Sequence, residues 1–282
     1  MFKMIKKILI PTDGYGLEDH VIRYTARAFP FAEFYVLSVI NVCERGVQLT
    51  NLLYKEMKEG AKRAIDEAKK ILKEEGIEDV HTRMLEGIPS KIINNYAKRR
   101  DIDMIAMRVY SRKSTVSAQR MGSTVRNVIR YAKVPILTLA EECEKIPIKK
   151  ILFPTDGKKN SEGAKNFSIM FASHYKAEIE VLHVLREKKS RHHADEIMKN
   201  VKWKSSFWNI KIKKSIEEGE VAEKILEHAK DNDLIIMGIG KRFFIWHYIG
   251  HVTQTIVTHS PVPVILIPFA KKRWKKRVVF SY

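Results

Sequence analysis

A nine-residue segment occurs twice in this chain, and the repeat limits the possible folds more than any other feature does. Residues 6–14 read KKILIPTDG and residues 149–157 read KKILFPTDG, so eight of nine positions are identical at an offset of 143. Shorter matches follow in the same order: EGI at 86–88 with EGE at 218–220, DMIAM at 103–107 with DLIIM at 233–237, and VPI at 134–136 with VPV at 262–264. An ordered series of this kind indicates a tandem duplication. The 282 residues suit two domains of roughly 140 each.

Within each copy, short apolar runs alternate with segments of helical periodicity. In the first copy we expect strands at 8–11, 34–41, 80–85, 103–107 and 134–139, with helices near 16–29, 51–76, 88–100 and 121–132. In the second copy we expect strands near 150–154, 178–185, 209–216, 233–237 and 263–268. Strand–helix alternation predicts an α/β fold in which each copy is a parallel sheet with helices on both faces.

The repeat also predicts the domain boundaries. We expect one α/β domain at 1–142, a linker at 143–148, a second α/β domain at 149–270 and a basic tail at 271–282. Because the linker is short and charged, the two copies are expected to pack on each other as an intramolecular pseudo-dimer.

Composition excludes several classes of protein. There are only two cysteines, Cys43 and Cys143, which rules out a disulfide framework. No apolar run approaches the roughly 18 residues of a membrane helix, and the N-terminus lacks the apolar region of a signal peptide. We therefore expect a cytoplasmic protein with no transmembrane segment. A net charge of +19 favours contact with polyanions, and the alternative is simple solubility in a thermophile-like, Lys/Glu-rich chain.

The repeated Pro-Thr-Asp-Gly lies where the first strand of each copy ends. Open parallel sheets bind ligands beyond the carboxyl ends of their strands. The carboxylates of Asp13 and Asp156 could accept hydrogen bonds from a ribose, and the preceding prolines, Pro11 and Pro154, could flank a base. The alternative is that these aspartates cap the helix that follows.

The segment after the fourth strand carries a second signal. In the second copy Gly238 and Gly240 follow the strand, and Gly250 opens the next helix. Glycines allow the backbone to approach a phosphate closely, and a helix start offers free amides, although an ordinary turn would use the same residues. The first copy has Arg108 where the second has Gly238, and Gly122-Ser123 opens its helix.

Taken together, these motifs resemble the universal stress protein family, over nearly the whole chain and as two consecutive domains. The resemblance rests on both Pro-Thr-Asp-Gly segments, VLHV at 181–184, both Glu-Gly turns, IMG at 236–238, Gly122-Ser123 and the two Val-Pro strand starts. It implies doubly wound five-stranded sheets of order 3-2-1-4-5, and pairing through the last strand within the chain or in a homodimer. In the nucleotide-binding branch of the family it implies an ATP or AMP site. That branch carries Gly-x-x-Gly, nine residues, then Gly-Ser or Gly-Thr.

Both copies depart from that pattern. In the first copy Arg108 and Ser111 replace the early glycines, and ten residues rather than nine precede Gly122. In the second, Lys241 occupies the second glycine position, and His251 replaces the hydroxyl residue. The resemblance assigns these positions to the two candidate nucleotide sites: Pro11, Thr12, Asp13, Val39, Met107, Arg108, Gly122 and Ser123 in the first, and Pro154, Thr155, Asp156, Val184, Met237, Gly238, Gly240 and Gly250 in the second. We expect at least one site to hold ATP or AMP, with Arg108 either obstructing its phosphate loop or contacting phosphate directly.

Enzyme chemistry has little support in the sequence. The chain has no Gly-x-Ser-x-Gly, phosphate-binding Gly-x4-Gly-Lys-Ser/Thr, His-Glu-x-x-His or Cys-x-x-Cys motif. We expect no metal beyond magnesium accompanying a nucleotide, and at most slow ATP hydrolysis. The predicted function is a non-catalytic nucleotide-binding or sensing module of the stress response. The alternatives are a scaffold or dimerisation protein that binds no nucleotide, and a basic adaptor that binds nucleic acid or anionic membrane through Lys271–Arg277.

Overall fold

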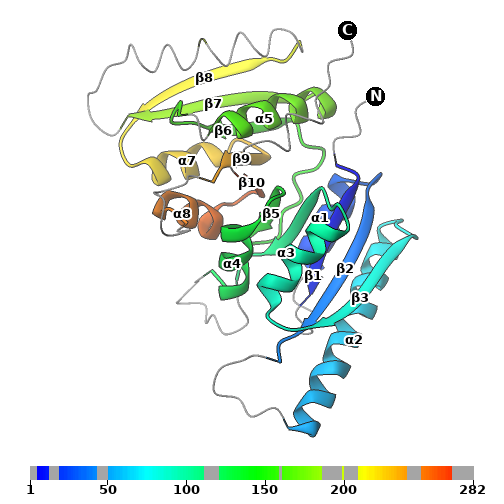
Figure 1. Ribbon diagram of the computed structural model, residues 1–282. Helices are drawn as coiled ribbons and strands as arrows, with labels where there is room; N and C mark the ends of the chain where they lie inside the picture. Colours follow the sequence, from blue (N-terminus) through cyan, green and yellow to red (C-terminus); the bar gives the residue numbers. More distant parts are fainter. Residues whose placement is uncertain are drawn as a thin grey trace. The chain divides into compact units, whose positions relative to one another are not determined.

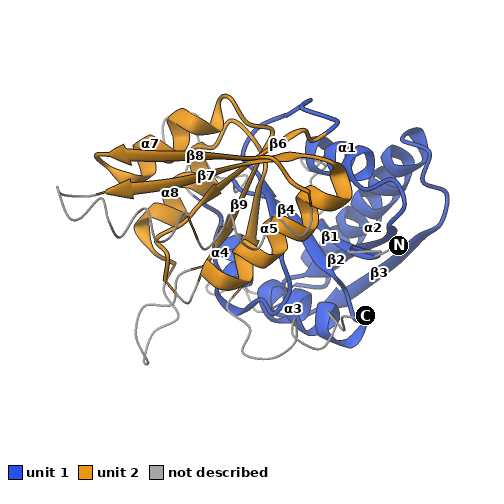
Figure 2. Cartoon of the chain, turned by 90° about the horizontal axis from the view of Figure 1, so that it is seen from above, with its two compact units in different colours: residues 1–147 blue, residues 148–282 orange. Residues whose placement is uncertain are grey.

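The computed structural model describes residues 5–12, 19–42, 50–110, 121–158, 161–185, 199, 209–239 and 249–268. The chain divides into two compact units, residues 1–147 and 148–282 (Figure 2). Several residues named in the sequence predictions lie outside the described residues, namely Asp13, Cys43, Ser111, Gly240, Lys241 and the basic tail. No helix in the described part of the chain is long and apolar enough to cross a membrane.

The first unit is a five-stranded parallel sheet with four described helices (Figure 1). Its elements are β1 (Lys7–Thr12), α1 (Asp19–Ala28), β2 (Glu33–Ile40), α2 (Asn51–Glu74), β3 (Val80–Glu86), α3 (Pro89–Arg99), β4 (Met104–Arg108), α4 (Ser123–Tyr131) and β5 (Ile136–Leu139). The strand order is β3-β2-β1-β4-β5, and these strands pair with their neighbours in parallel.

The second unit repeats this architecture. Its elements are β6 (Lys150–Pro154), α5 (Glu162–Tyr175), β7 (Glu178–Leu185), β8 (Ile212–Glu218), α7 (Val221–Ala229), β9 (Leu234–Gly238), α8 (His251–His259) and β10 (Val264–Ile267). The order β8-β7-β6-β9-β10 is again 3-2-1-4-5 when strands are counted within the unit. The predicted fold class is therefore confirmed for both copies.

Continuous apolar runs form the central strands because both faces of each sheet are covered. Ile8, Leu9 and Ile10 of β1 are fully buried, as are Ile151 and Leu152 of β6. The edge strands β3 and β8 have no buried residue, because every position is half-buried or exposed, and their sequence is mixed. In the first unit α1 and α2 pack on one face of the sheet, and α3 and α4 pack on the other. In the second unit α7 packs against α8, and α5 packs against strands β6, β9 and β10.

A repeated aspartate holds the first strand of each unit at its amino end. Asp103 Oδ2 accepts hydrogen bonds from the backbone amides of Lys6 (3.0 Å) and Lys7 (3.1 Å). Asp233 Oδ2 accepts from the amides of Lys149 (2.8 Å) and Lys150 (2.9 Å). These amides lie at or just before the strand starts, so the carboxylates give them hydrogen-bond partners where the strand begins. The Asp residues in the repeated DMIAM and DLIIM segments are thus structural.

The two Glu-Gly turns also have a common backbone reason. Gly87 follows β3 with φ of 132°, and Gly219 follows β8 with φ of 139°. L-residues with a side chain rarely adopt this conformation, whereas glycine does so without strain. The turn sends the chain from the edge strand into α3 or α7, and only glycine allows it to do so without cost.

Candidate functional site

The residues assigned to each candidate site lie where strands end on one edge of their sheet. In parallel sheets the carboxyl ends of neighbouring strands share an edge. In the first unit Thr12 ends β1 and pairs in register with Ser38 of β2, and Arg108 ends β4. In the second unit Pro154 ends β6 and pairs with Leu182 of β7. The remaining described positions on these edges are Pro11, Val39 and Met107 in the first unit and Thr155, Asp156, Val184, Met237 and Gly238 in the second.

The second strand of each unit holds the backbone at the end of the first. Ser38 Oγ donates to the Thr12 carbonyl (3.4 Å), and His183 Nδ1 bonds the Thr155 carbonyl (2.8 Å). A carbonyl only accepts, so His183 Nδ1 carries the proton in this bond. Ser38 and His183 are both buried and occupy the same place in the repeat. Our site prediction did not include either residue, although His183 lies in the VLHV segment that supported the family resemblance.

Asp156 is fixed by its own loop and exposes its carboxylate. Its Oδ1 accepts from the Lys158 backbone amide (3.0 Å), and its Oδ2 lies 3.4 Å from Lys158 Nζ. The Asp156 side chain is 57% exposed. The amide partner precedes α5, which begins at Glu162, so Asp156 forms a local Asx turn and does not cap that helix. The capping alternative is therefore wrong for Asp156.

Thr155 stabilises the same loop. Its Oγ1 accepts from the Gly157 amide (3.1 Å) and donates to Ser161 Oγ (3.2 Å). Ser161 Oγ in turn donates to the Lys158 carbonyl (2.7 Å), and Gly157 has φ of 71°. The loop thus holds Asp156 in place through short bonds between neighbouring residues.

Both glycine-led helices begin without a side-chain cap, as the sequence predicted. Gly122 precedes α4 and Gly250 precedes α8, and neither helix has an acidic residue in its first turn. The amides of the first turn have no partner within the helix, so such a start attracts anions. Among the described residues, a Cβ built on Gly250 would meet no atom within 4 Å, so no described side chain crowds this helix start. Ser123, the first residue of α4, is exposed.

The backbone after the fourth strand follows the same path in both units. Val109 N donates to the Leu139 carbonyl (3.0 Å), and Ile239 N donates to the Ile267 carbonyl (2.9 Å). These matching bonds place Arg108 and Gly238 at equivalent positions in the two units.

Arg108 changes the first unit at that position. Its Nη2 donates to the Tyr110 carbonyl (3.0 Å), so the guanidinium folds back over its own loop. Tyr110 also forms an antiparallel bridge with Met121. Burial, and secondly the positive charge of Arg108, lower the pKa of His20 at the start of α1. The first unit therefore has a cation where the second has a glycine.

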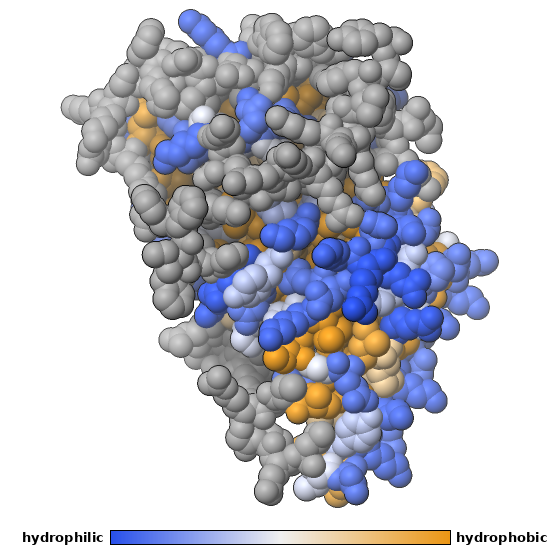
Figure 3. Space-filling view, in the orientation of Figure 1, coloured by the Kyte–Doolittle hydropathy of each residue, from blue (hydrophilic) through white to orange (hydrophobic). Residues whose placement is uncertain are grey.

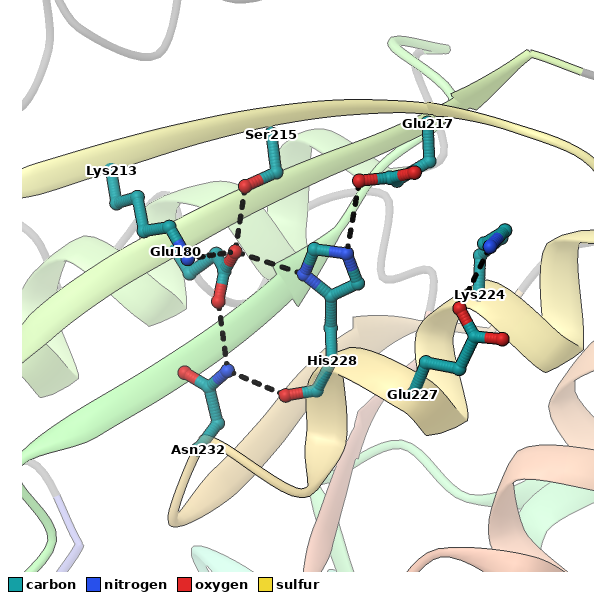
Figure 4. Close-up of polar contacts among 8 residues, drawn as sticks. All are labelled: Glu180, Lys213, Ser215, Glu217, Lys224, Glu227, His228 and Asn232. Carbon is teal, nitrogen blue, oxygen red and sulfur yellow. Dashed lines mark hydrogen bonds and ion pairs between the residues drawn. The ribbon is translucent and has the colours of Figure 1, made fainter.

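A buried polar cluster lies in the second unit away from this edge (Figure 4). Glu180 of β7 accepts from Ser215 Oγ (2.6 Å), Lys213 Nζ (2.9 Å), Asn232 Nδ2 (2.9 Å) and His228 Nδ1 (2.9 Å). Asn232 precedes β9, so the cluster lies toward the amino ends of the strands. Burial alone would raise the pKa of Glu180, but these hydrogen bonds outweigh it and lower the pKa to about 2. The cluster stabilises the attachment of α7 to β7 and β8.

Comparisons with known proteins agree with the resemblance found in the sequence. A family model described as "Universal stress protein family" matches residues 4–139 and again residues 147–268. A universal stress protein of Methanocaldococcus jannaschii is 31% identical over 146 residues, which cover 48% of this chain and 82% of that protein. A universal stress protein of Mycolicibacterium smegmatis is 20% identical over 289 residues, covering 92% of this chain and 96% of that protein.

A solved structure extends the likeness to the fold of the whole chain. The crystal structure of a universal stress protein from Archaeoglobus fulgidus matches with a TM-score of 0.76 at 22% identity, covering 95% of this chain and 97% of that one. At this identity the likeness concerns the fold alone. The double match to the family model and the repeated strand order lead to one conclusion: the chain belongs to the universal stress protein family, as a tandem pair of its domains.

Proposed function

We propose that this protein is a non-catalytic adenine-nucleotide-binding module of the stress response, and that the carboxyl edge of the second unit is its principal ATP or AMP site. The observation that carries the proposal is the exposed carboxylate of Asp156 on the edge where α8 begins at an uncapped Gly250. A nucleotide needs acceptors for its ribose at one end and donors for its phosphates at the other. This edge of the sheet offers both.

Contacts within its own loop orient the carboxylate at the ribose end of the proposed site. Asp156 Oδ1 is bonded to the Lys158 amide, while the side chain as a whole remains more than half exposed. A carboxylate held in this way can accept from ribose hydroxyls without losing much side-chain entropy on binding. Lys158 Nζ at 3.4 Å is exposed, so a ligand can displace it at little cost.

The phosphate end of the proposed site would use backbone groups. Gly238 ends β9 without a side chain, and no described atom lies within 4 Å of a Cβ built on Gly250, where the first amides of α8 begin. Backbone amides at a helix start bind anionic oxygens, and no side chain in this unit is required to supply the charge. The nucleotide would act by linkage, because it stabilises the folded form to which it binds.

The first unit supports a second candidate role, as a structural partner that binds no nucleotide. Arg108 is bonded to the carbonyl of Tyr110 and occupies the position of the glycine in the second unit. A nucleotide phosphate would have to compete with that bond. We propose that this half serves mainly as a scaffold.

The experiment that tests the proposed site is a thermal shift of nucleotide-stripped protein with ATP, comparing wild type with Asp156→Ala. At a hundredfold excess over the dissociation constant, a ligand stabilises the folded state by about 2.7 kcal/mol, so wild type should show a clear rise in Tm. Asp156→Ala should lose most of that rise. The control is Asp231→Ala, which removes another exposed carboxylate of the same unit and should keep the full shift. An equal shift in Asp156→Ala and wild type would exclude Asp156 from nucleotide binding.

A further inference from the structure

Helices α3 and α4 of the first unit carry cations and no carboxylates. The two helices have 11 and 9 residues and pack against each other on one face of the sheet. Their charged residues are Lys91, Lys98 and Arg99 in α3 and Arg126 and Arg130 in α4. Arg100 and Lys133 follow the two helix ends, and one exposed carboxylate, Asp101, stands next to Arg100. We call the seven cationic residues the α3/α4 basic surface. In Figure 3 a strongly hydrophilic area covers the region of α3 on the face turned toward the viewer.

None of these seven cations has an ion pair with another residue in the described part of the chain. The opposite face of the same unit differs, because Arg23 and Arg27 of α1 pair with Glu74 and Glu75 at the end of α2, at distances of 2.7 to 3.1 Å. On the α3/α4 basic surface, five of the seven residues are exposed, and Arg126 and Arg130 are half-buried with Nε atoms that have no hydrogen-bond partner among the described residues. Two of the seven have local contacts without a counter-charge, because Arg126 Nη2 donates to the Met121 carbonyl (3.5 Å) and the Arg100 guanidinium lies 5.9 Å from the centre of the Tyr96 ring. Like charges without counter-charges repel one another, so this arrangement gains no stability from ion pairing.

The second unit shows that the fold does not need most of these cations. Its helices α7 and α8 occupy the same places and contain one lysine, Lys224, two glutamates, Glu223 and Glu227, and no arginine. A cation is kept only after the end of α7, where Lys230 follows as Arg100 follows α3. In the repeat, Lys91 corresponds to Glu223, Arg126 to Gln254 and Arg130 to Thr258. The same scaffold therefore folds with neutral or acidic residues at these positions, and the charge of the first unit requires another explanation.

We propose that the α3/α4 basic surface binds the phosphodiester backbone of nucleic acid. Unpaired arginines and lysines on one face release counterions when they contact phosphates. Three amide side chains lie among the cations, Asn94 and the exposed Asn95 on α3 and Asn127 on α4, and of these Asn94 Nδ2 donates to the Ser90 carbonyl (3.0 Å). Amide groups donate to phosphate and sugar oxygens and are common in such interfaces.

The same residues argue against a lipid partner. A membrane-binding surface interleaves its cations with large apolar side chains that enter the bilayer. Among the described residues of α3 and α4, Tyr131 at the end of α4 is the one exposed large hydrophobic side chain, at 49%, and Ile88 lies just before α3 at 39%. A surface of cations and amides fits a hydrated, charged backbone, and we expect contacts that are largely independent of base sequence.

The test is fluorescence anisotropy of the full chain with a labelled 20-base-pair DNA duplex and with RNA of the same length, over a range of salt concentrations. The double variant Arg126→Gln/Arg130→Thr takes its residues from the equivalent positions of the second unit. At 0.1 M salt this variant should bind both probes at least about tenfold more weakly than wild type. The magnitude of its slope of log affinity against log salt concentration should be smaller by about 2. The control Lys69→Gln/Lys70→Gln removes the same charge from exposed positions on α2 and should change binding much less.

Each outcome of the test has a clear meaning. Equal losses in the two double variants would show a general effect of net charge and overturn the proposal, as would unchanged binding in the α4 variant. If nucleic acid bound through Lys271–Arg277 alone, the α4 variant would bind as tightly as wild type, and this result would likewise refute the proposal. Vesicles containing phosphatidylserine supply the other anionic surface, and loss of vesicle binding without loss of nucleic-acid binding would assign the surface to membranes. Circular dichroism and thermal melting of each variant establish that it is folded.

Discussion

Neutralising Glu180 tests how much one buried carboxylate contributes to the second unit. The Glu180 side chain is 7% exposed and accepts hydrogen bonds from four side chains, two of which carry or can carry a positive charge, Lys213 and His228. Glu180→Gln keeps the shape of the side chain but removes its charge. The new amide group also places N–H donors near side chains that themselves donate hydrogen bonds to Glu180. The variant should therefore weaken the contact of α7 with β7 and β8.

The expected magnitude follows from the pKa. A lowering from 4.5 to about 2, at about 1.4 kcal/mol for each pKa unit, corresponds to roughly 3 kcal/mol of stability at neutral pH. Because the folded-state pKa is lowered, the stabilisation is fully present above about pH 4.5 and is lost as the pH falls toward 2. The difference in stability between wild type and Glu180→Gln should shrink over that interval.

Urea unfolding followed by tryptophan fluorescence is the appropriate assay. All four tryptophans lie in residues 148–282, so the signal reports on the second half of the chain. The matched control is Glu178→Gln on the same strand, whose ion pair with Lys211 (3.1 Å) is exposed and should contribute less than about 1 kcal/mol. If Glu180→Gln destabilises no more than Glu178→Gln, or if its effect persists unchanged at pH 3, the reasoning from burial and hydrogen bonding is wrong.

Two further changes test the repeated structural residues. Asp103→Asn should lower the unfolding free energy by about 2 kcal/mol, because two backbone amides lose a charged acceptor that is 7% exposed. Asp233→Asn, at the half-buried equivalent position, should lower the unfolding free energy less. Circular dichroism during urea unfolding measures both variants, and a larger loss in Asp233→Asn would contradict the role of burial. Gly219→Ala should destabilise the fold by about 1 kcal/mol or more, because the backbone φ at Gly219 is 139°. Gly250→Ala should destabilise it much less, because Gly250 has an ordinary φ and no described atom within 4 Å of an added Cβ. Thermal melting compares the two variants, and equal effects would refute the backbone argument.

The fold could be predicted in detail because its signals are local and repeated. Buried parallel strands require short apolar runs, and these runs occur in the same order in both halves. The Glu-Gly turns were visible as matching pairs, and their positive φ gives the physical reason. The position of each candidate site at the carboxyl edge of its own sheet followed from the parallel strand arrangement alone.

The polar contacts within the units could not be predicted in the same way. Glu180 meets His228 and Asn232, which lie 48 and 52 residues further along the chain, and no local pattern indicates such partners. A glutamate within the apolar strand 178–185 was the one available signal. His183 could have been identified by aligning the repeats, because it occupies the place of Ser38 and bonds the equivalent carbonyl. The Asx turn of Asp156 depends on the geometry of one loop and left the capping alternative open in the sequence.

The most direct test of nucleotide binding is calorimetric titration of the nucleotide-stripped chain with ATP and with AMP. The expected result is binding with a stoichiometry near one, lost in Asp156→Ala and kept in Asp13→Ala, because the second unit retains Gly238 where the first has Arg108. Absence of binding heat at several temperatures, together with an unchanged Tm in excess nucleotide, would contradict the proposed function and leave a scaffold role for both halves.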